Sequence, residues 1–360
     1  MKLKVYQRNI IKDYLGSLSQ VTLVFFSLIL ILNIFEEINF FKDEDISVLI
    51  PILLTFLNAP TVLYEIFPFI FLISTQFFFL KIIENNEIIT YKNFGLSNIK
   101  IIRLISFTTF LLGILLIFLF YNFSAKLKFL YLDLKNDYAK DNKYLAVITE
   151  NGLWIKDEIN DKINLVNAEQ IEKQYLKNVS ITQFTSDFNL IQIINSDKVD
   201  ITNKTWRMEQ AKISIRNKQD EIIDSLDFDS NFDQLRINNL FSNLSSLTFW
   251  ELNELKKDYK ALGYSTVNIN LHNHKIYSYP FYIMLMTILS SVVMSNIKYN
   301  KSRIFNLILG ILLSVLIYYI NYFFNVFGVN EKIPLIFSIW MPIIILTLIV
   351  SIGLVRINEK

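Results

Sequence analysis

Residues 60–83 read PTVLYEIFPFIFLISTQFFFLKII, a long apolar run that contains Pro60, Pro68 and a single carboxylate, Glu65. An α-helix crosses the hydrocarbon core of a bilayer in about 20 residues, so a run of this length fits one crossing. The run therefore predicts a membrane-spanning helix.

Further runs of the same kind lie on both sides of this one. They are Leu18–Phe35, Ile101–Tyr121, Ile276–Ile297, Ile304–Phe327 and Ile333–Val355. Hydrophobic residues make up 52% of the chain and it contains 31 Phe, a composition typical of a multi-pass membrane protein with one aqueous domain. Three spans, a polar block and three more spans exclude a soluble enzyme.

The distribution of Lys and Arg predicts the topology, because short cytoplasmic loops keep an excess of these residues. Four basic residues precede the first span, whereas the loop 36–59 contains Lys42 alone beside five acidic residues. Basic residues also surround the loops after the second and fourth spans. Both termini are therefore expected inside and the polar block outside. The first span lacks a small-residue cleavage site, so we expect it to be retained as a membrane helix.

The polar block shows short alternating runs separated by turn clusters, which favours an antiparallel β-sandwich or jelly-roll-like sheet. The runs are Leu145–Thr149, Leu153–Lys156, Lys162–Val166, Val179–Phe184, Leu190–Ile194 and Thr205–Arg216. Helical spacing follows over 247–262, with Gly263 as a terminator. We expect an α+β membrane protein divided into 1–122 (spans one to three), 123–270 (the external β-domain with its connecting helix) and 271–360 (spans four to six).

Motifs for a reaction are missing from the sequence. It contains no G-x-x-x-x-G-K-[ST] phosphate loop and no paired-histidine metal motif, and the absence of cysteine excludes disulfides and thiolate sites. His272 and His274 have no carboxylate at metal-ligand spacing, so we expect interfacial polar residues and not ligands. Charge is mixed throughout the polar block, which predicts no nucleic-acid partner.

The loop after the second span reads KIIENNEIITYKNFGLSNIKIIR over residues 81–103. An acid near its start and Gly95 as a left-handed cap predict a short helix at about 82–97 that lies along the membrane surface. An ordinary solvated loop, on which Glu87 and Lys92 only decorate a polar face, also explains this composition.

The order and spacing of several segments resemble the LptF/LptG family of lipopolysaccharide export permeases. These segments are Pro60 and Pro68 in the second span, Glu87 in the polar turn, Asn93-Phe94-Gly95-Leu96-Ser97 after it, Leu271-His272-x-x-Lys275…Pro280 before the fourth span, and Ile333-Pro334…Pro342 in the sixth. Asn151-Gly152-Leu153-Trp154-Ile155-Lys156-Asp157 and Thr205-Trp206-Arg207-Met208 resemble the LptG subunit more closely than LptF. The resemblance covers nearly the whole chain.

This resemblance implies a permease subunit of an ATP-binding-cassette exporter in the bacterial inner membrane. Its implied partners are a second, LptF-type permease, a dimer of an LptB-type cytoplasmic ATPase and an LptC-type periplasmic carrier. The ATPase would bind ATP, so this chain would hold no cofactor, no metal and no catalytic residue. Lipopolysaccharide would leave the membrane through the periplasmic β-domain.

Two groups of site residues follow from the resemblance. In the family the loop helix sits in a groove of the ATPase, which implies an electrostatic contact at Glu87 and a close turn at Gly95. The apolar anchors of that contact would be Ile88, Tyr91 and Phe94. The lipid cavity would be formed mainly by the first, second and fifth spans, with candidate contacts at Asn33, Lys42, Phe67, Phe71, Tyr318 and Asn321.

These cavity residues also fit a plainer interpretation, in which each aromatic packs or faces lipid and each polar group bonds a neighbouring helix. The rim departs from the family, because Lys42 stands beside Asp43, Glu44 and Asp45. Other functions stay open: a membrane-anchored sensor or scaffold, and an ion-coupled carrier. The carrier ranks last, because no internal repeat is visible and Glu65 is the only carboxylate within a span.

Overall fold

The computed structural model describes residues 4–42, 47–138, 153–159, 162–172, 174–215, 219–234, 237, 243–261, 265–295, 303–330 and 332–358. The chain divides into two compact units. The helical unit comprises Met1–Lys128 and Val267–Lys360, and the β-unit comprises Phe129–Thr266. The boundaries predicted from the sequence lie at 122/123 and 270/271.

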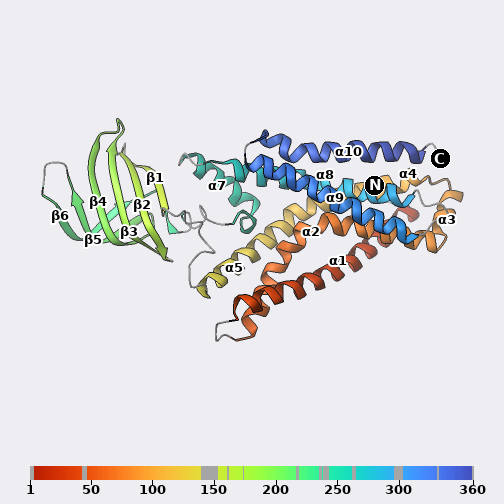
Figure 1. Ribbon diagram of the computed structural model, residues 1–360, viewed down its shortest axis with the longest axis horizontal. Coiled ribbons are helices and arrows are strands. Elements are labelled where there is room, and N and C mark those ends of the chain that lie inside the picture. Colours follow the sequence, from red (N-terminus) through yellow and green to blue (C-terminus); the bar gives the residue numbers. More distant parts are fainter. Residues whose placement is uncertain are drawn as a thin grey trace. The chain divides into compact units, whose positions relative to one another are not determined.

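The helical unit contains long apolar helices (Figure 1). They are α1 (Val5–Phe40), α2 (Leu49–Glu84), α4 (Asn98–Leu115), α8 (Val267–Ser295), α9 (Arg303–Val329) and α10 (Leu335–Asn358). A short helix, α3 (Glu87–Asn93), joins α2 to α4. In the described part of the chain, 6 helices are long and apolar enough to cross a membrane. The six predicted spans are therefore confirmed, and the chain is a multi-pass membrane protein.

The third span is longer than the sequence indicates. The prediction ended it at Tyr121, but α4 continues through the π-helical segment η1 (Leu116–Tyr121) into α5 (Asn122–Tyr138). The continuation is polar, so a hydropathy pattern does not detect it. Because α5 begins in the helical unit and ends in the β-unit, it belongs to both.

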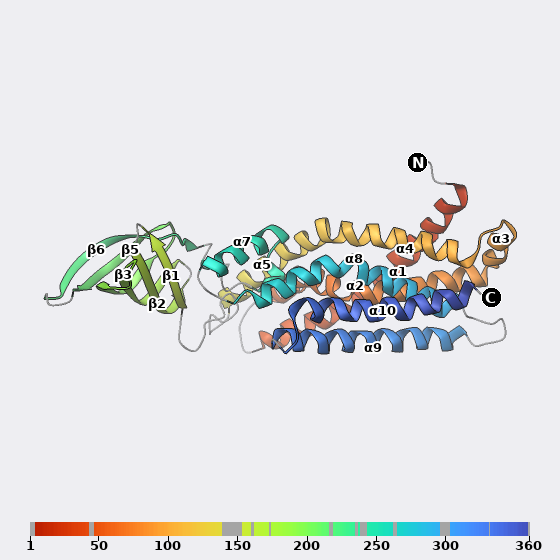
Figure 2. The ribbon, with the colours of Figure 1, turned by 90° about the horizontal axis from the view of Figure 1, so that it is seen from above.

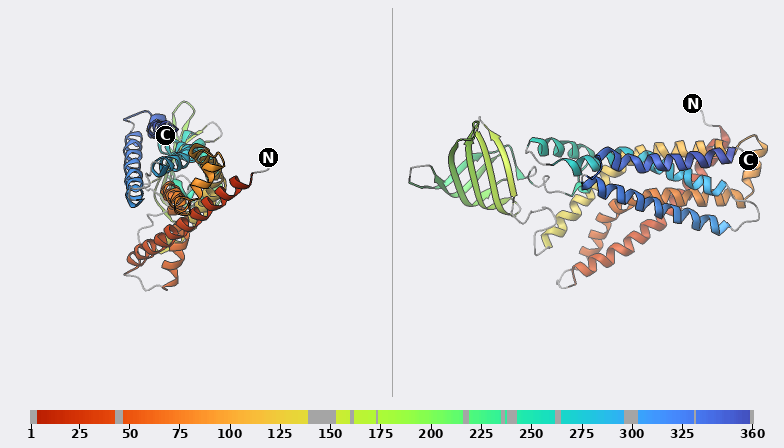
Figure 3. Two further views of the ribbon diagram at one scale, coloured as in Figure 1. Left: turned by 90° about the vertical axis from the view of Figure 1, so that its right-hand side faces the viewer. Right: turned by 45° about the horizontal axis from the view of Figure 1, so that its top comes forward.

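Two helices form the centre of the helical unit. In the most apolar stretch of each helix, 61% of the residues of α2 and 67% of those of α8 are buried within the structure. In α1 and in α9, only 17% of the residues of that stretch are buried. Figure 2 shows α8 running alongside both α2 and α10, and Figure 3 shows α1 and α9 towards the outside of the bundle. The core around Leu72 and Met286 joins α2 and α8 to α9 and α10.

Small and hydroxyl residues allow these central helices to approach one another. A Cβ added to Gly113 of α4 would lie 2.8 Å from the Cα of Pro280 on α8. On α8, Ser290 is fully buried and donates a 2.8 Å hydrogen bond to the Leu72 carbonyl of α2. Close backbones and interhelical hydrogen bonds are typical of packing inside a membrane, where apolar burial alone does not bring helices together.

The β-unit contains a 6-stranded antiparallel sheet in which each strand pairs with its sequence neighbour, in the order β1-β2-β3-β4-β5-β6 (Figure 1). The strands are β1 (Leu153–Ile159), β2 (Lys162–Glu172), β3 (Tyr175–Thr185), β4 (Leu190–Asp200), β5 (Thr205–Ser214) and β6 (Glu221–Asp229). The predicted inserted antiparallel β-domain is confirmed. The described strands make one sheet and not the two of a sandwich.

The sheet curls, so that its first strand meets the segment after its last. Asp157 of β1 accepts hydrogen bonds from the Ser230 hydroxyl at 2.8 Å and from the Asn231 backbone at 3.0 Å. The buried Trp206 indole donates to the Phe232 carbonyl at 2.7 Å. A single curved sheet can thus cover its own apolar face, which explains why a second sheet is not needed here.

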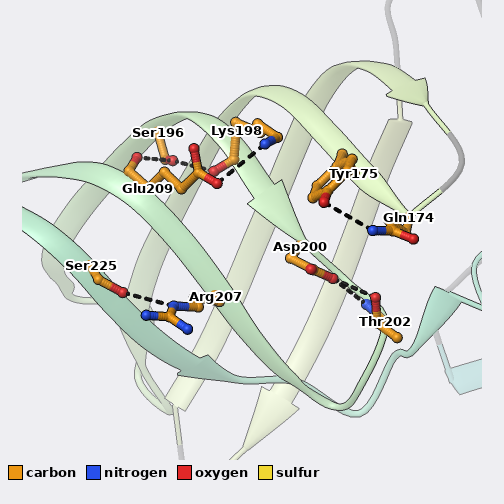
Figure 4. A network of polar contacts seen from close by, with 9 residues as sticks. All are labelled: Gln174, Tyr175, Ser196, Lys198, Asp200, Thr202, Arg207, Glu209 and Ser225. Atoms are coloured by element: carbon orange, nitrogen blue, oxygen red, sulfur yellow. Dashed lines mark hydrogen bonds and ion pairs between the residues drawn. The ribbon is translucent and has the colours of Figure 1, made fainter.

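Hydrogen bonds and ion pairs on the sheet connect neighbouring strands (Figure 4). Lys198 lies 3.2 Å from Glu209 and 4.2 Å from the centre of the Tyr175 ring. Thr202 donates to Asp200 through its hydroxyl and its backbone N–H, and these bonds lower the pKa of that carboxyl. Such exposed contacts fix strand register more than they stabilise the fold.

Some predictions for this block differ from the structure or lie outside it. The strand β6 was missed, because among its residues only Phe228 is buried and the apolar alternation is weak. The helix expected over 247–262 is α7 (Phe249–Ala261), which begins with a capping box between Thr248 and Glu251. The run Leu145–Thr149 and the terminator Gly263 lie outside the described residues.

Candidate functional site

The loop between α2 and α4 has a defined conformation that its sequence specifies. Gly95 has φ of +75°, a left-handed conformation that glycine adopts without strain. The Leu96 N–H bonds the Tyr91 carbonyl at 3.0 Å and the Gly95 N–H bonds the Lys92 carbonyl at 2.9 Å. This pair of bonds is a Schellman motif, which ends α3 and turns the chain towards α4. The left-handed cap predicted at Gly95 is therefore confirmed.

The five residues predicted to couple this loop to an ATPase lie together on α3 and its end. Glu87 accepts a 3.0 Å hydrogen bond from Asn85, and no residue of α3 is buried. Ile88 and Tyr91 are half-buried, whereas Phe94 is 81% exposed. A short helix without a buried face contributes little to the core, so its side chains are available to another protein.

Electrostatics link this loop to the beginning of α1. Desolvation raises the pKa of Tyr91, and the nearby carboxylates Glu87 and Asp13 raise it further. Asp13 also forms a 3.0 Å ion pair with Lys81 at the end of α2. The first helix, the end of the second helix and the loop helix thus meet at one end of the helical unit, here called the loop end.

A second polar cluster lies on α2, α5 and α8, away from the loop end. It comprises Asn58, Glu65, Lys128, His272 and Lys275, here called the Glu65 cluster. Glu65 lies about 24 Å along α2 from Lys81 at 1.5 Å per residue. The cluster and the loop helix are therefore separated by most of a bilayer's thickness.

Charges of both signs meet within the Glu65 cluster. The Glu65 carboxylate is within electrostatic reach of Lys128 and Lys275, and both Glu65 and Lys275 are exposed within the unit. Lys128 donates a 2.7 Å hydrogen bond to the Asn58 amide oxygen. A pair of lysines around one carboxylate leaves a positive balance, which favours an anionic group such as a phosphate.

Aromatic side chains close this cluster on its buried side. The Tyr121 hydroxyl and His272 Nε2 are 2.9 Å apart. Tyr279 donates a 2.5 Å hydrogen bond to the Tyr64 carbonyl, and the rings of these tyrosines stack 4.4 Å apart.

The other histidine, His274, lies 3.4 Å from the Trp340 indole nitrogen. Among the described residues there is no group of three or more His, Cys, Asp or Glu that could hold a metal.

The residues predicted for the lipid cavity differ in how exposed they are within the subunit. Phe67 and Phe71 are 6% and 1% exposed and pack inside the subunit, where Phe67 meets Phe120 edge-on at 5.3 Å. Tyr318 is half-exposed on α9, and Asn321 hydrogen-bonds Tyr282 of α8.

The remaining two predicted cavity residues lie on or just after α1. Asn33 is buried, and its amide nitrogen has no hydrogen-bond partner among the described residues. Lys42 is exposed at the end of α1. Within one subunit, the coupling residues thus lie on one short helix and its end, whereas the predicted cavity residues come from α1, α2, α9 and the turn after α1.

Sequence reasoning did not assign the lysines of the Glu65 cluster to a site. Lys128 lies beyond the predicted end of the third span, in the segment expected to be external. Lys275 was noted only within the approach to the fourth span. The signal that could have found them is Glu65, because a carboxylate within an apolar span requires a cationic partner.

The fold and these two regions define a class: a six-span membrane protein with an inserted antiparallel β-domain and an exposed helix in one of its loops. A family model described as lipopolysaccharide export system permease LptF/LptG matches residues 8–356. The chain therefore belongs to the LptF/LptG family of lipopolysaccharide export permeases. The match does not separate the two subunit types. A search of the curated proteins found no match.

Proposed function

We propose that this chain is one permease subunit of an ATP-driven exporter that extracts lipopolysaccharide from the bacterial inner membrane and passes it through the β-unit towards the outer membrane. Its partners would be an LptF-type permease, a dimer of an LptB-type ATPase that alone binds ATP, and an LptC-type periplasmic carrier. The segments Asn151–Asp157 and Thr205–Met208 favour the LptG-type subunit.

The observation that carries this proposal is the loop helix α3. It is short and exposed, and it is anchored at both ends to membrane-spanning helices. The Schellman motif fixes the position of Phe94 at the end of α3, while Glu87 supplies a charge in the first turn of the same helix. A partner that binds this helix gains a direct mechanical connection to α2 and α4. That is what a separate ATPase needs in order to move the permease.

The Glu65 cluster supports an anionic cargo. The sequence offers Lys42 as the only basic residue on the rim after the first span, whereas the fold adds Lys128 and Lys275 on α5 and α8. Ammonium groups at a membrane interface suit the phosphates of a lipid A-type headgroup. The exposed Tyr318 of α9, which is not part of this cluster, would offer a hydroxyl to the sugar groups of the cargo.

A direct test starts from the complex that is purified with co-expressed partners and reconstituted into lipid vesicles. Glu87→Lys should lower both ATPase-subunit recovery and coupled lipopolysaccharide release by at least about tenfold, because it reverses a charge at the contact. Glu84→Lys, a charge-matched change outside α3, should leave both nearly unchanged. Equal behaviour of the two variants, or a complex without any nucleotide-binding subunit, would contradict the proposal.

The proposed orientation has its own test. Single cysteines can report on sidedness, because the natural chain contains none. Ser186→Cys, in the turn after β3, should react with a membrane-impermeant maleimide from the periplasmic side. Asn93→Cys, at the end of α3, should react only after the membrane is opened. The reverse pattern would place the β-unit in the cytoplasm and rule out the proposed route.

A further inference from the structure

The third membrane helix contains a π-helical segment, η1 (Leu116–Tyr121), between α4 and α5. A turn closed by i→i+5 hydrogen bonds holds one residue more than an α-helical turn, and such segments are rare and frequent at functional sites. Three residues before η1 in the chain, Gly113 packs so closely against Pro280 that α4 is held in place against α8. The extra residue is therefore stored between an anchored helix and the helix α5 that follows.

Polar side chains bond backbone carbonyls of this segment and of the first turn of α5. The Asn122 side-chain amide donates to the Phe118 carbonyl at 2.8 Å. From α2, the Thr61 hydroxyl donates to the Ser124 carbonyl at 3.2 Å, and both residues are buried. A side chain that bonds a helix carbonyl replaces a regular backbone donor. The π register is thus supported by specific contacts and not by lipid alone.

Two further contacts fix which side of α5 faces the Glu65 cluster. The Tyr121 hydroxyl meets His272 of α8 at 2.9 Å, at the last residue of η1. Two turns later, Lys128 meets Asn58 of α2 at 2.7 Å. If η1 became α-helical, the stored residue would pass into α5, and each later residue would turn by about 100°. Leu127 would then occupy the place of Lys128, and Phe120 that of Tyr121.

We propose that Tyr121 and His272 are positioning residues that hold α5 in the π register and thereby direct Lys128 into the Glu65 cluster. Phenylalanine at the place of Tyr121 cannot bond the imidazole, so the contact distinguishes the two registers. The consequence for cargo binding rests on the proposed export function, but the register itself does not.

Cysteine pairs can measure the register in the full chain. Asn58→Cys is combined with either Lys128→Cys or Leu127→Cys, and membranes are treated with a short thiol-specific bifunctional cross-linker. The 58–128 pair should dominate when Tyr121 is present. Tyr121→Phe should shift the ratio towards 58–127 by about fivefold, the effect of one lost hydrogen bond. An unchanged ratio would overturn the proposal.

Variants at position 272 test the same contact from α8, in case Tyr121→Phe does not fold. His272→Ala should shift the cross-linking ratio as Tyr121→Phe does, whereas His272→Gln, which places an amide near the position of Nε2, should restore it. A shift that is equally large in both variants would mean that the bond to Tyr121 is not the cause, and would overturn the proposal.

A deletion provides the matched control. Leu119 is 63% exposed, so its removal takes one residue out of η1 with little loss of packing. Without a stored residue, the chain should keep the 58–128 cross-link even when Tyr121→Phe is added. If the deletion instead moved residue 129 into the place of Lys128, so that a 58–129 cysteine pair cross-linked in place of the 58–128 pair, then η1 would store no extra residue. Lipopolysaccharide release by the reconstituted complex is measured separately, so a failed export function does not affect the register result.

Discussion

The helices α2 and α8 differ from α1 and α9 in a way that their apolar character does not show. All four are long enough and apolar enough to span a membrane. Yet most of the apolar stretch of α2 and α8 is buried within the subunit, while that of α1 and α9 is largely exposed. The difference shows that span prediction and packing role are separate questions.

Hydroxyl groups in the apolar parts of α8 and α1 bond in different ways. On α8, the Ser290 hydroxyl bonds a carbonyl of α2, and Thr287 lies 3.4 Å from Thr109 of α4. On α1, by contrast, the Ser27 hydroxyl bonds the Leu23 carbonyl of its own helix. A hydroxyl that bonds within its helix gives no information on neighbours, whereas one that bonds across helices holds two of them together. The outer faces of α1 and α9 are left for lipid or another subunit.

The largest effect is expected where two central helices touch. Gly113→Leu should lower the stability of the folded subunit by more than about 3 kcal/mol, because even its Cβ would collide with the backbone of α8. Gly16→Leu on α1 is the matched control. Apart from the neighbouring residues and backbone of α1 itself, no atom of the described residues lies within 4 Å of a Cβ at that position, so leucine should be neutral or slightly stabilising there.

The measurement for this pair is the fraction of monodisperse protein that detergent extracts from membranes, followed by thermal unfolding of that fraction. Comparable losses at both positions would mean that α1 is packed as tightly as α4 in the membrane. The contrast between central and outer helices would then fail.

An intermediate effect is expected when a side chain is shortened. Leu72 on α2 is fully buried in the core with Met286, whereas Leu28 on α1 is 49% exposed. Leu72→Ala should cost about 2 kcal/mol, the low end for buried leucines, because lipid replaces water as the surrounding solvent. Leu28→Ala should change the unfolding midpoint little. A cost at Leu28 as large as that at Leu72 would show that a partner covers α1.

Much of this fold could be predicted because its signals are local. The length and apolar composition of each span predict a membrane helix, and glycine at position 95 predicts a left-handed turn. The strand β6 was missed because an edge strand with one buried side chain has no clear alternation. The curvature of the sheet that brings Asp157 close to Ser230 could not be predicted from the sequence either, because it depends on contacts between segments far apart in the chain.

The two candidate regions differ in the same way. The coupling residues 87–95 are adjacent in sequence, so a single stretch could identify them. The Glu65 cluster combines residues from three helices, and Lys128 follows a polar continuation that hydropathy assigned to the external block. The rotation that directs Lys128 towards Asn58 depends on η1. Sequence alone does not show whether one helical turn holds an extra residue.

The smallest effect is expected from the hydroxyls themselves. Ser290→Ala removes a hydrogen bond between α8 and α2 and should cost about 0.6 kcal/mol, a typical value for such bonds within membranes. Ser27→Ala removes only a bond within α1, so its effect on the thermal unfolding midpoint should be indistinguishable from zero. The pair is informative because both changes remove the same atom from the same residue type. If the two midpoints shift equally, hydroxyls do not distinguish central from outer helices, and the contrast rests on apolar packing alone.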